Sequence, residues 1–180
     1  MISLNVMMWI FIILFAIVGA IRGWAKEILV TFSVILALFI MVVLENYIPF
    51  FKSIIKDSSP TTVFWVRSII LIIMVIVGYQ TPRMGKLAEI GHWLRNMLSD
   101  SLLGIIFGAI NGYLLFGTVW YYMAAAHYPF PFVIAPDPST AIGQKALEWI
   151  SMLPPAWLMQ TPLIYIAVAV CFIFVLVAVI

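Results

Sequence analysis

Residues 2–44 read ISLNVMMWIFIILFAIVGAIRGWAKEILVTFSVILALFIMVVL, and this stretch decides the fold class. It holds two uncharged, mostly apolar runs, Ile2–Ile21 and Ile28–Leu44, with a short charged turn between them. A helix rises about 1.5 Å per residue, so about 17–25 apolar residues cross the hydrocarbon core of a bilayer. The stretch is therefore predicted to form a hairpin of two transmembrane helices.

Three further runs of this kind follow at Val63–Tyr79, Ser101–Met123 and Leu163–Ile180. The composition agrees with them, because 66% of the residues are apolar and 9% are charged, against about 45–50% and about 25% in soluble domains. Lipid must cover the apolar surface that one small core cannot bury. We expect an all-α integral membrane protein, a bundle of about five transmembrane helices.

Two connectors have the period of amphipathic helices that lie in the membrane interface. In the first, apolar residues recur every three or four positions from Met84 to Leu98, and the second covers Thr140–Leu153. Between the fourth span and the second of these helices, four prolines alternate with Phe130 and Phe132, which predicts a loop pressed onto the membrane or onto a partner. The expected organisation is a four-helix core at 1–123, an interfacial segment at 124–161 and an additional helix at 162–180. We expect that last helix to be a docking element, dispensable for folding of the first four.

The charges set a topology and exclude some partners. Nine Lys and Arg residues against seven Asp and Glu residues give a net charge of +2, which is too small for nucleic-acid binding. The turn after the first span and the connector after the third together carry five basic residues, against three or four on the opposite side. The positive-inside rule then places the amino terminus outside and the carboxyl terminus in the cytoplasm.

Residues 100–112, DSLLGIIFGAING, form the most distinctive motif. Gly104, Gly108 and Gly112 are four apart, and such a strip lets another helix backbone approach closely in lipid. Asn111 lies about 60° from Gly108 on the helix, which directs its amide into the same seam. We interpret the motif as a packing seam with a polar contact; the alternative is a ligand or ion pathway that uses Asn111.

The turn between the first two spans carries Arg22, Gly23, Lys26 and Glu27. Glycine permits a tight turn, and a carboxylate is favourable at the amino end of the second helix. These residues are typical of a turn that sets topology; the alternative is a contact surface for a cytoplasmic partner.

Arg67 lies about 6 Å inside the third span at 1.5 Å per residue. We expect its side chain to extend to the lipid headgroups. Pairing with Glu45 or Asp57, which belong to the same side of the membrane, is the competing interpretation.

Candidates for chemistry are few. Cys171 is the single cysteine, which excludes an internal disulfide or a four-thiolate zinc site. His92 and His127 fall on opposite sides, so each is interpreted as a surface residue, or alternatively as a lone ligand to a haem or chlorophyll. No nucleophile, base and orienting group can be assembled, and no phosphate loop occurs. We therefore expect a non-enzymatic protein with no cofactor or metal.

The motifs Arg22-Gly23-x-x-Lys26-Glu27 and Asp100-x-x-Leu103-Gly104-x-x-Phe107-Gly108-x-x-x-Gly112 resemble those of the colicin V production protein family. The resemblance covers roughly residues 1–123, and the stretch ending near Trp149 is similar to the segment after that family's fourth helix. It implies a small four-helix protein of the bacterial inner membrane, linked to colicin export or to anchoring of periplasmic proteases, with no established enzymatic site. The sequence departs from the family in three ways. Asn111 and Tyr113 flank Gly112 where a basic residue commonly lies nearby, the Pro/Phe-rich loop is long, and a fifth span follows.

Three functions remain open. The first is a scaffold or accessory subunit of a larger envelope complex, which acts by helix packing in the lipid bilayer with other membrane subunits or as a homo-oligomer. The second is a component of solute or peptide export. The third is a cofactor-associated bioenergetic subunit that uses a lone histidine.

Overall fold

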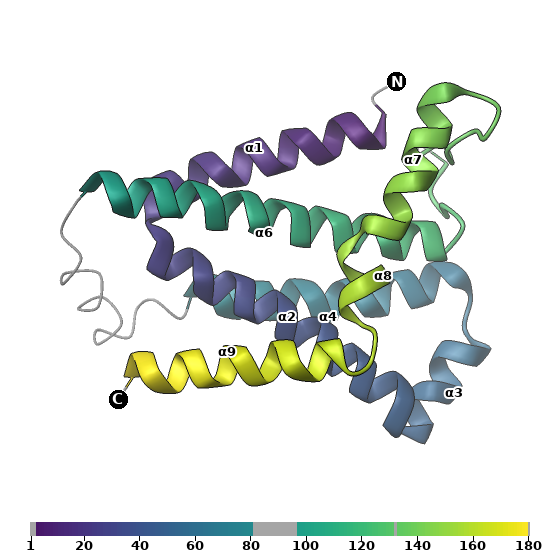
Figure 1. Cartoon of the computed structure of the whole chain (residues 1–180). Helices are drawn as coiled ribbons and strands as arrows, with labels where there is room; N and C mark the ends of the chain where they lie inside the picture. The colour runs from purple at the N-terminus through teal and green to yellow at the C-terminus, as the bar shows by residue number, and fades with distance from the viewer. Residues whose placement is uncertain (1–2, 81–96, 132, 180) are drawn as a thin grey trace.

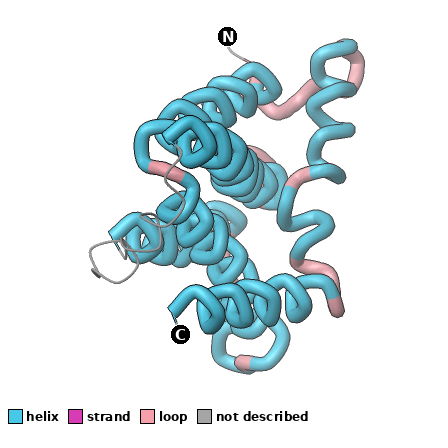
Figure 2. The backbone as a smooth tube through the Cα atoms, turned by 60° about the vertical axis from the view of Figure 1, so that its left-hand side comes forward, coloured by secondary structure: helices cyan, strands magenta, loops and turns pink. Residues whose placement is uncertain are grey.

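A computed structural model describes residues 3–80, 97–131 and 133–179, with all of its regular structure helical in those ranges. Figure 1 shows the helices, and Figure 2 shows the short loops that join them. The helices are α1 (Leu4–Arg22), α2 (Trp24–Tyr47), α3 (Pro49–Asp57), α4 (Pro60–Gln80), α6 (Met97–Ala125), α7 (Ala141–Met152), α8 (Pro154–Leu158) and α9 (Leu163–Val179). The predicted all-α class is confirmed.

In the described part of the chain, four helices are long and apolar enough to cross a membrane: α1, α2, α4 and α6. They correspond to the first four predicted spans, and α1 begins two residues after the predicted start at Ile2. A fifth crossing results if the stretch Ala141–Leu158 and the helix after it, which meet at 60°, count as one bent span. The protein is thus a multi-pass membrane bundle of four to five spans.

The long helices pack in a fixed order. Helices α1 and α6 run side by side along most of their length, α2 packs against both α4 and α6, and α9 lies on α2. The Gly23 turn, the start of α6 and the end of α9 lie at one end of the bundle, whereas the amino terminus, α3 and α7 lie at the other (Figure 1). The two termini are therefore at opposite ends.

The interior consists of apolar layers between these helices. Trp120 of α6 is fully buried with Met8 of α1 and Leu153 after α7. Tyr122 of α6 and Leu38 of α2 belong to a second buried cluster. Helix α6 contributes to both clusters and is the central element of the fold.

The regions outside the spans depart from the sequence predictions in part. The predicted helix from Met84 to Leu98 falls almost wholly outside the described residues, as does His92. The second predicted amphipathic helix is α7, which begins where the Thr140 hydroxyl accepts a hydrogen bond from the Gly143 amide at 3.0 Å. Helix α3 was not predicted.

The aromatic loop and the last helix both pack on this same chain. The Phe130 ring lies 5.2 Å from that of Phe64 on α4, so the loop has an intramolecular contact. Helix α9 buries Ile164 completely, and its Phe174 ring lies 5.3 Å from that of Phe32 on α2. The inner face of α9 is thus occupied within the bundle.

Candidate functional site

The glycines of the 100–112 motif face α1. Gly104, Gly108 and Gly112 are all buried. A Cβ atom on Gly104 would collide with the carbonyl oxygen of Gly19, and one on Gly112 would lie 2.7 Å from that of Phe11. Because the obstructing atoms are backbone, any side chain at these positions would force the two helices apart. The motif forms a close helix contact of the small-xxx-small kind.

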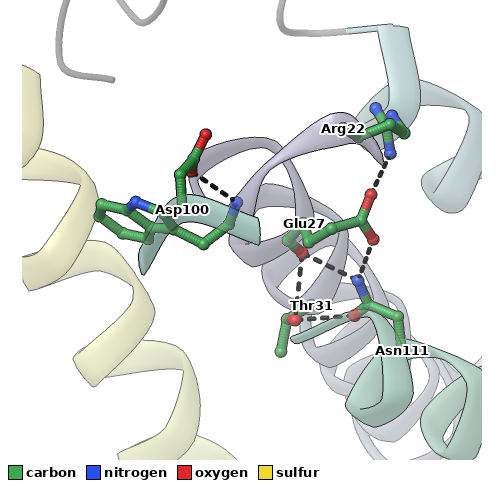
Figure 3. A network of polar contacts seen from close by, with 6 residues as sticks. Arg22, Glu27, Thr31, Asp100 and Asn111 are labelled. Atoms are coloured by element: carbon green, nitrogen blue, oxygen red, sulfur yellow. Dashed lines mark hydrogen bonds and ion pairs between the residues drawn. The ribbon is translucent and has the colours of Figure 1, made fainter. Parts of the chain in front are cut away.

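The seam ends at the turn between α1 and α2. Gly23 has φ 84°, in the left-handed region that favours glycine, and a Cβ there would lie 2.8 Å from Asp100 Oδ2. Gly23 precedes α2 and has no side chain with which to cap the helix. Instead, the Trp24 amide donates to Asp100 Oδ1 at 3.3 Å (Figure 3). A carboxylate from α6 thus complements the positive end of α2.

Glu27 lies one turn further along α2 and is 0% exposed. Its Oε1 accepts a hydrogen bond from Arg22 at 2.6 Å, in an ion pair whose arginine side chain is 21% exposed. Its Oε2 accepts from Asn111 Nδ2 at 2.8 Å (Figure 3). Both carboxylate oxygens are therefore bound, as the burial of a charge requires.

Asn111 is buried on α6 and directs its amide to α2. Its Nδ2 also donates to the backbone carbonyl of Glu27 at 2.9 Å, and its Oδ1 accepts from the Thr31 hydroxyl at 2.7 Å. The sequence placed this amide in the glycine seam, but the seam faces α1. The 60° offset from Gly108 turns the amide to the neighbouring helix.

Arg22 adds a fourth helix to the network. Its guanidinium carbon lies 4.2 Å from the centroid of the Tyr79 ring, a cation–π contact with α4. The polar network thus joins α1, α2, α4 and α6 at one end of the bundle. Of the four turn residues singled out by sequence, only Lys26 is exposed.

Arg67 is part of a second ion pair. Its Nε donates to Glu45 Oε1 at 2.8 Å, with the two side chains 19% and 23% exposed, and its guanidinium carbon lies 5.6 Å from the centroid of the Tyr122 ring. Within the protein, the side chain pairs with Glu45, which was the competing interpretation; its position relative to the headgroups stays a prediction. The competing pairing occurs because α2 presents a carboxylate where α4 carries the cation.

Sequence reasoning missed several members of the network. Thr31 and Tyr79 carried no signal of their own, since single hydroxyl-bearing residues are ordinary in apolar helices. Asp100 was read only as the first residue of the motif. Gly19, however, stands four residues before Gly23, and this repeat mirrors the one in α6.

The arrangement stabilises helix contacts, because each carboxylate oxygen of Glu27 accepts a hydrogen bond from a neighbouring helix or turn residue. Within residues 3–80, 97–131 and 133–179, no group of three or more His, Cys, Asp or Glu side chains is placed to hold a metal ion. His127 lies exposed just after α6. Chemically, the site is an ion pair extended by hydrogen bonds to Asn111 and Thr31.

These features define a class: a multi-pass helical membrane protein whose spans are joined by a glycine seam and a buried ion pair. The model of the colicin V production protein family matches residues 4–142. The chain belongs to that family, as its motifs predicted, and the match extends from α1 into α7. A search of curated proteins gives no match, and a search of solved structures gives none either.

Proposed function

We propose that this protein is a non-enzymatic scaffold or accessory subunit of a larger bacterial envelope complex, and that α1 is the helix it presents to its partner. The exposure of α1 carries the proposal. Only 11% of its spanning window is buried, against 22% for α4, 44% for α6 and 50% for α2. Trp9, Ile13 and Ile17, one turn apart, are each more than half exposed.

The buried network supports a structural role. Glu27 has both carboxylate oxygens bound, and the amide of Asn111 donates and accepts within the same network. Ionisable groups that mark pathways for protons or ions face a water-filled cavity or form relays of such groups inside the bundle. A closed network instead fixes the orientation of the helices around it.

Site-specific photocrosslinking in native membranes tests the proposal. A photoreactive amino acid at Ile13 of α1 should give a discrete protein adduct. Ile73 of α4 is the matched control, since its exposure, 54%, is close to the 57% of Ile13. We expect only lipid adducts there. Lipid adducts alone at both positions would refute the proposal.

The family description favours a second candidate, a role in the production or export of colicin V. In a colicin-producing strain without an endogenous member of the family, expression of this chain should then restore extracellular colicin activity. Equal activity with and without the chain would exclude this role.

We also infer that the protein resides in the bacterial inner membrane with its amino terminus outside. The bundle end with Arg22 and Lys26 is then cytoplasmic. In a Cys171→Ala background, a cysteine at Lys26 should resist an impermeant thiol reagent in intact cells, whereas one at Asp137 should react. The opposite pattern would reverse the orientation.

A further inference from the structure

Helix α3 stands apart from the rest of the bundle. None of its nine residues, Pro49–Asp57, is buried, and it packs chiefly against the end of α2 (Figure 1). It begins just after α2 ends at Tyr47 and ends just before α4 begins at Pro60. Two spans therefore leave the bilayer where α3 lies, which places α3 at the level of the membrane surface.

The sequence of α3 divides the helix into two faces. At 100° per residue, Phe50, Phe51, Ile54 and Ile55 fall within an arc of about 140°. Lys52 and Lys56, one turn apart, lie together on the opposite arc. Phe50 is 74% exposed, and Tyr47 and Ile48 just before the helix extend the apolar surface.

The two lysines have no ion-pair partner among the described residues, and both are exposed. Asp57 is the single acid of the helix. An apolar face with a pair of lysines on the opposite side of the helix matches the chemistry of an anionic lipid surface. The apolar side chains enter the acyl boundary, and the long lysine side chains extend to the phosphates.

We propose that α3 lies in the membrane interface and binds the phosphates of anionic phospholipid headgroups through Lys52 and Lys56. Phe50 and Ile54 then face the acyl chains, and Ser53 faces the water. This surface is separate from α1, at which the proposed partner binds, so either proposal can fail without the other.

The first test measures the depth of α3 in the full-length protein. The Cys171→Ala variant, with a spin label at position 54 or 53, is reconstituted in nanodiscs that contain phosphatidylglycerol. The label at 54 should collide with oxygen, which concentrates in lipid, and the label at 53 with a water-soluble nickel chelate. Equal access of the chelate to both labels overturns the proposal. A label at 54 that meets neither reagent indicates a protein partner instead and also overturns it.

The second test measures lipid selectivity. Nanodiscs with equal phosphatidylglycerol and phosphatidylcholine are used, and the lipids retained by the released protein are counted by native mass spectrometry. One lysine near an anionic surface contributes about fivefold in affinity, so Lys52→Gln with Lys56→Gln should lower the preference for phosphatidylglycerol by about 10- to 30-fold.

Two control variants complete the second test. The pair Lys52→Arg and Lys56→Arg keeps the charge and should keep the preference. Lys145→Gln removes the single lysine of α7, a helix also predicted to lie in the interface, and should lower the preference by about fivefold at most. A preference unaltered by the double glutamine variant, or lowered equally by Lys145→Gln, overturns the role of the two lysines.

Discussion

Asn111→Leu removes the amide that binds Glu27 and keeps the number of side-chain heavy atoms. The lost Nδ2 donates to the Glu27 carboxylate at 2.8 Å and to its backbone carbonyl at 2.9 Å. A hydrogen bond to a charged group contributes about 1.5–3 kcal/mol and a neutral one about 0.5–1.5, although membrane proteins average lower values, about 0.6. For two lost bonds, we therefore expect the free energy of unfolding to fall by about 1–4 kcal/mol.

A double-mutant cycle with Glu27→Leu isolates the contact between the Asn111 amide and the Glu27 carboxylate. Asn111→Leu removes the bond to the backbone carbonyl of residue 27 whether that residue is Glu or Leu, so this bond cancels in the cycle. We expect a coupling energy of about 1–2 kcal/mol. The assay is reversible unfolding in mixed micelles, titrated with sodium dodecyl sulfate. Asn5→Leu is the control, since the buried Asn5 oxygen has no hydrogen-bond partner among the described residues; it should cost little. Additive effects of Asn111→Leu and Glu27→Leu would refute the network.

Three further predictions use the same assay. Gly108→Leu should destabilise the protein by more than about 2 kcal/mol, because the new side chain meets the α1 backbone. The control Ile106→Leu, at a position 53% exposed, should change stability by less than about 0.5 kcal/mol. Similar effects of the two would show that the seam is not a close contact. Asp100→Ala should cost about 0.5–2 kcal/mol through loss of the α2 cap, and no change would mean that solvent serves equally well. Arg67→Met should destabilise more than Arg67→Met combined with Glu45→Met, because the single change leaves a carboxylate unpaired; a more damaging double variant contradicts the pairing.

The spans were predictable because the bilayer imposes a length. The uncharged run 101–123 lies within the longer α6, and the ends differ because helices continue past the hydrocarbon core. Helix α3 was not predicted, because the bilayer imposes no length on a helix that does not span it. Nine residues are too few for a length criterion, and only the alternation of Phe50, Phe51, Ile54 and Ile55 with Lys52 and Lys56 marks the helix.

The glycine seam and the ion-pair network differ in how much of each a single sequence contains. A glycine repeat of four residues, read in one helix alone, predicts that another helix packs closely there, whichever helix that is. The partner of Asn111 is another matter, because a helical wheel gives angles around α6 without saying which helix stands at each angle. The bond between Asn111 and Glu27 joins residues 84 apart in the chain, so it depends on the packing order of the bundle.

The two ion pairs bear on how α1 is held. Arg22–Glu27 and Arg67–Glu45 both anchor α2, near its two ends, to neighbouring helices. Along its span, α1 is held by the glycine seam, where backbone meets backbone, and by Met8 and Phe11, which pack on side chains of α6. A rotation of α1 would lose both the close backbone contact and this side-chain packing. The face with Trp9, Ile13 and Ile17 is therefore fixed in one direction, as a docking surface for a partner subunit requires.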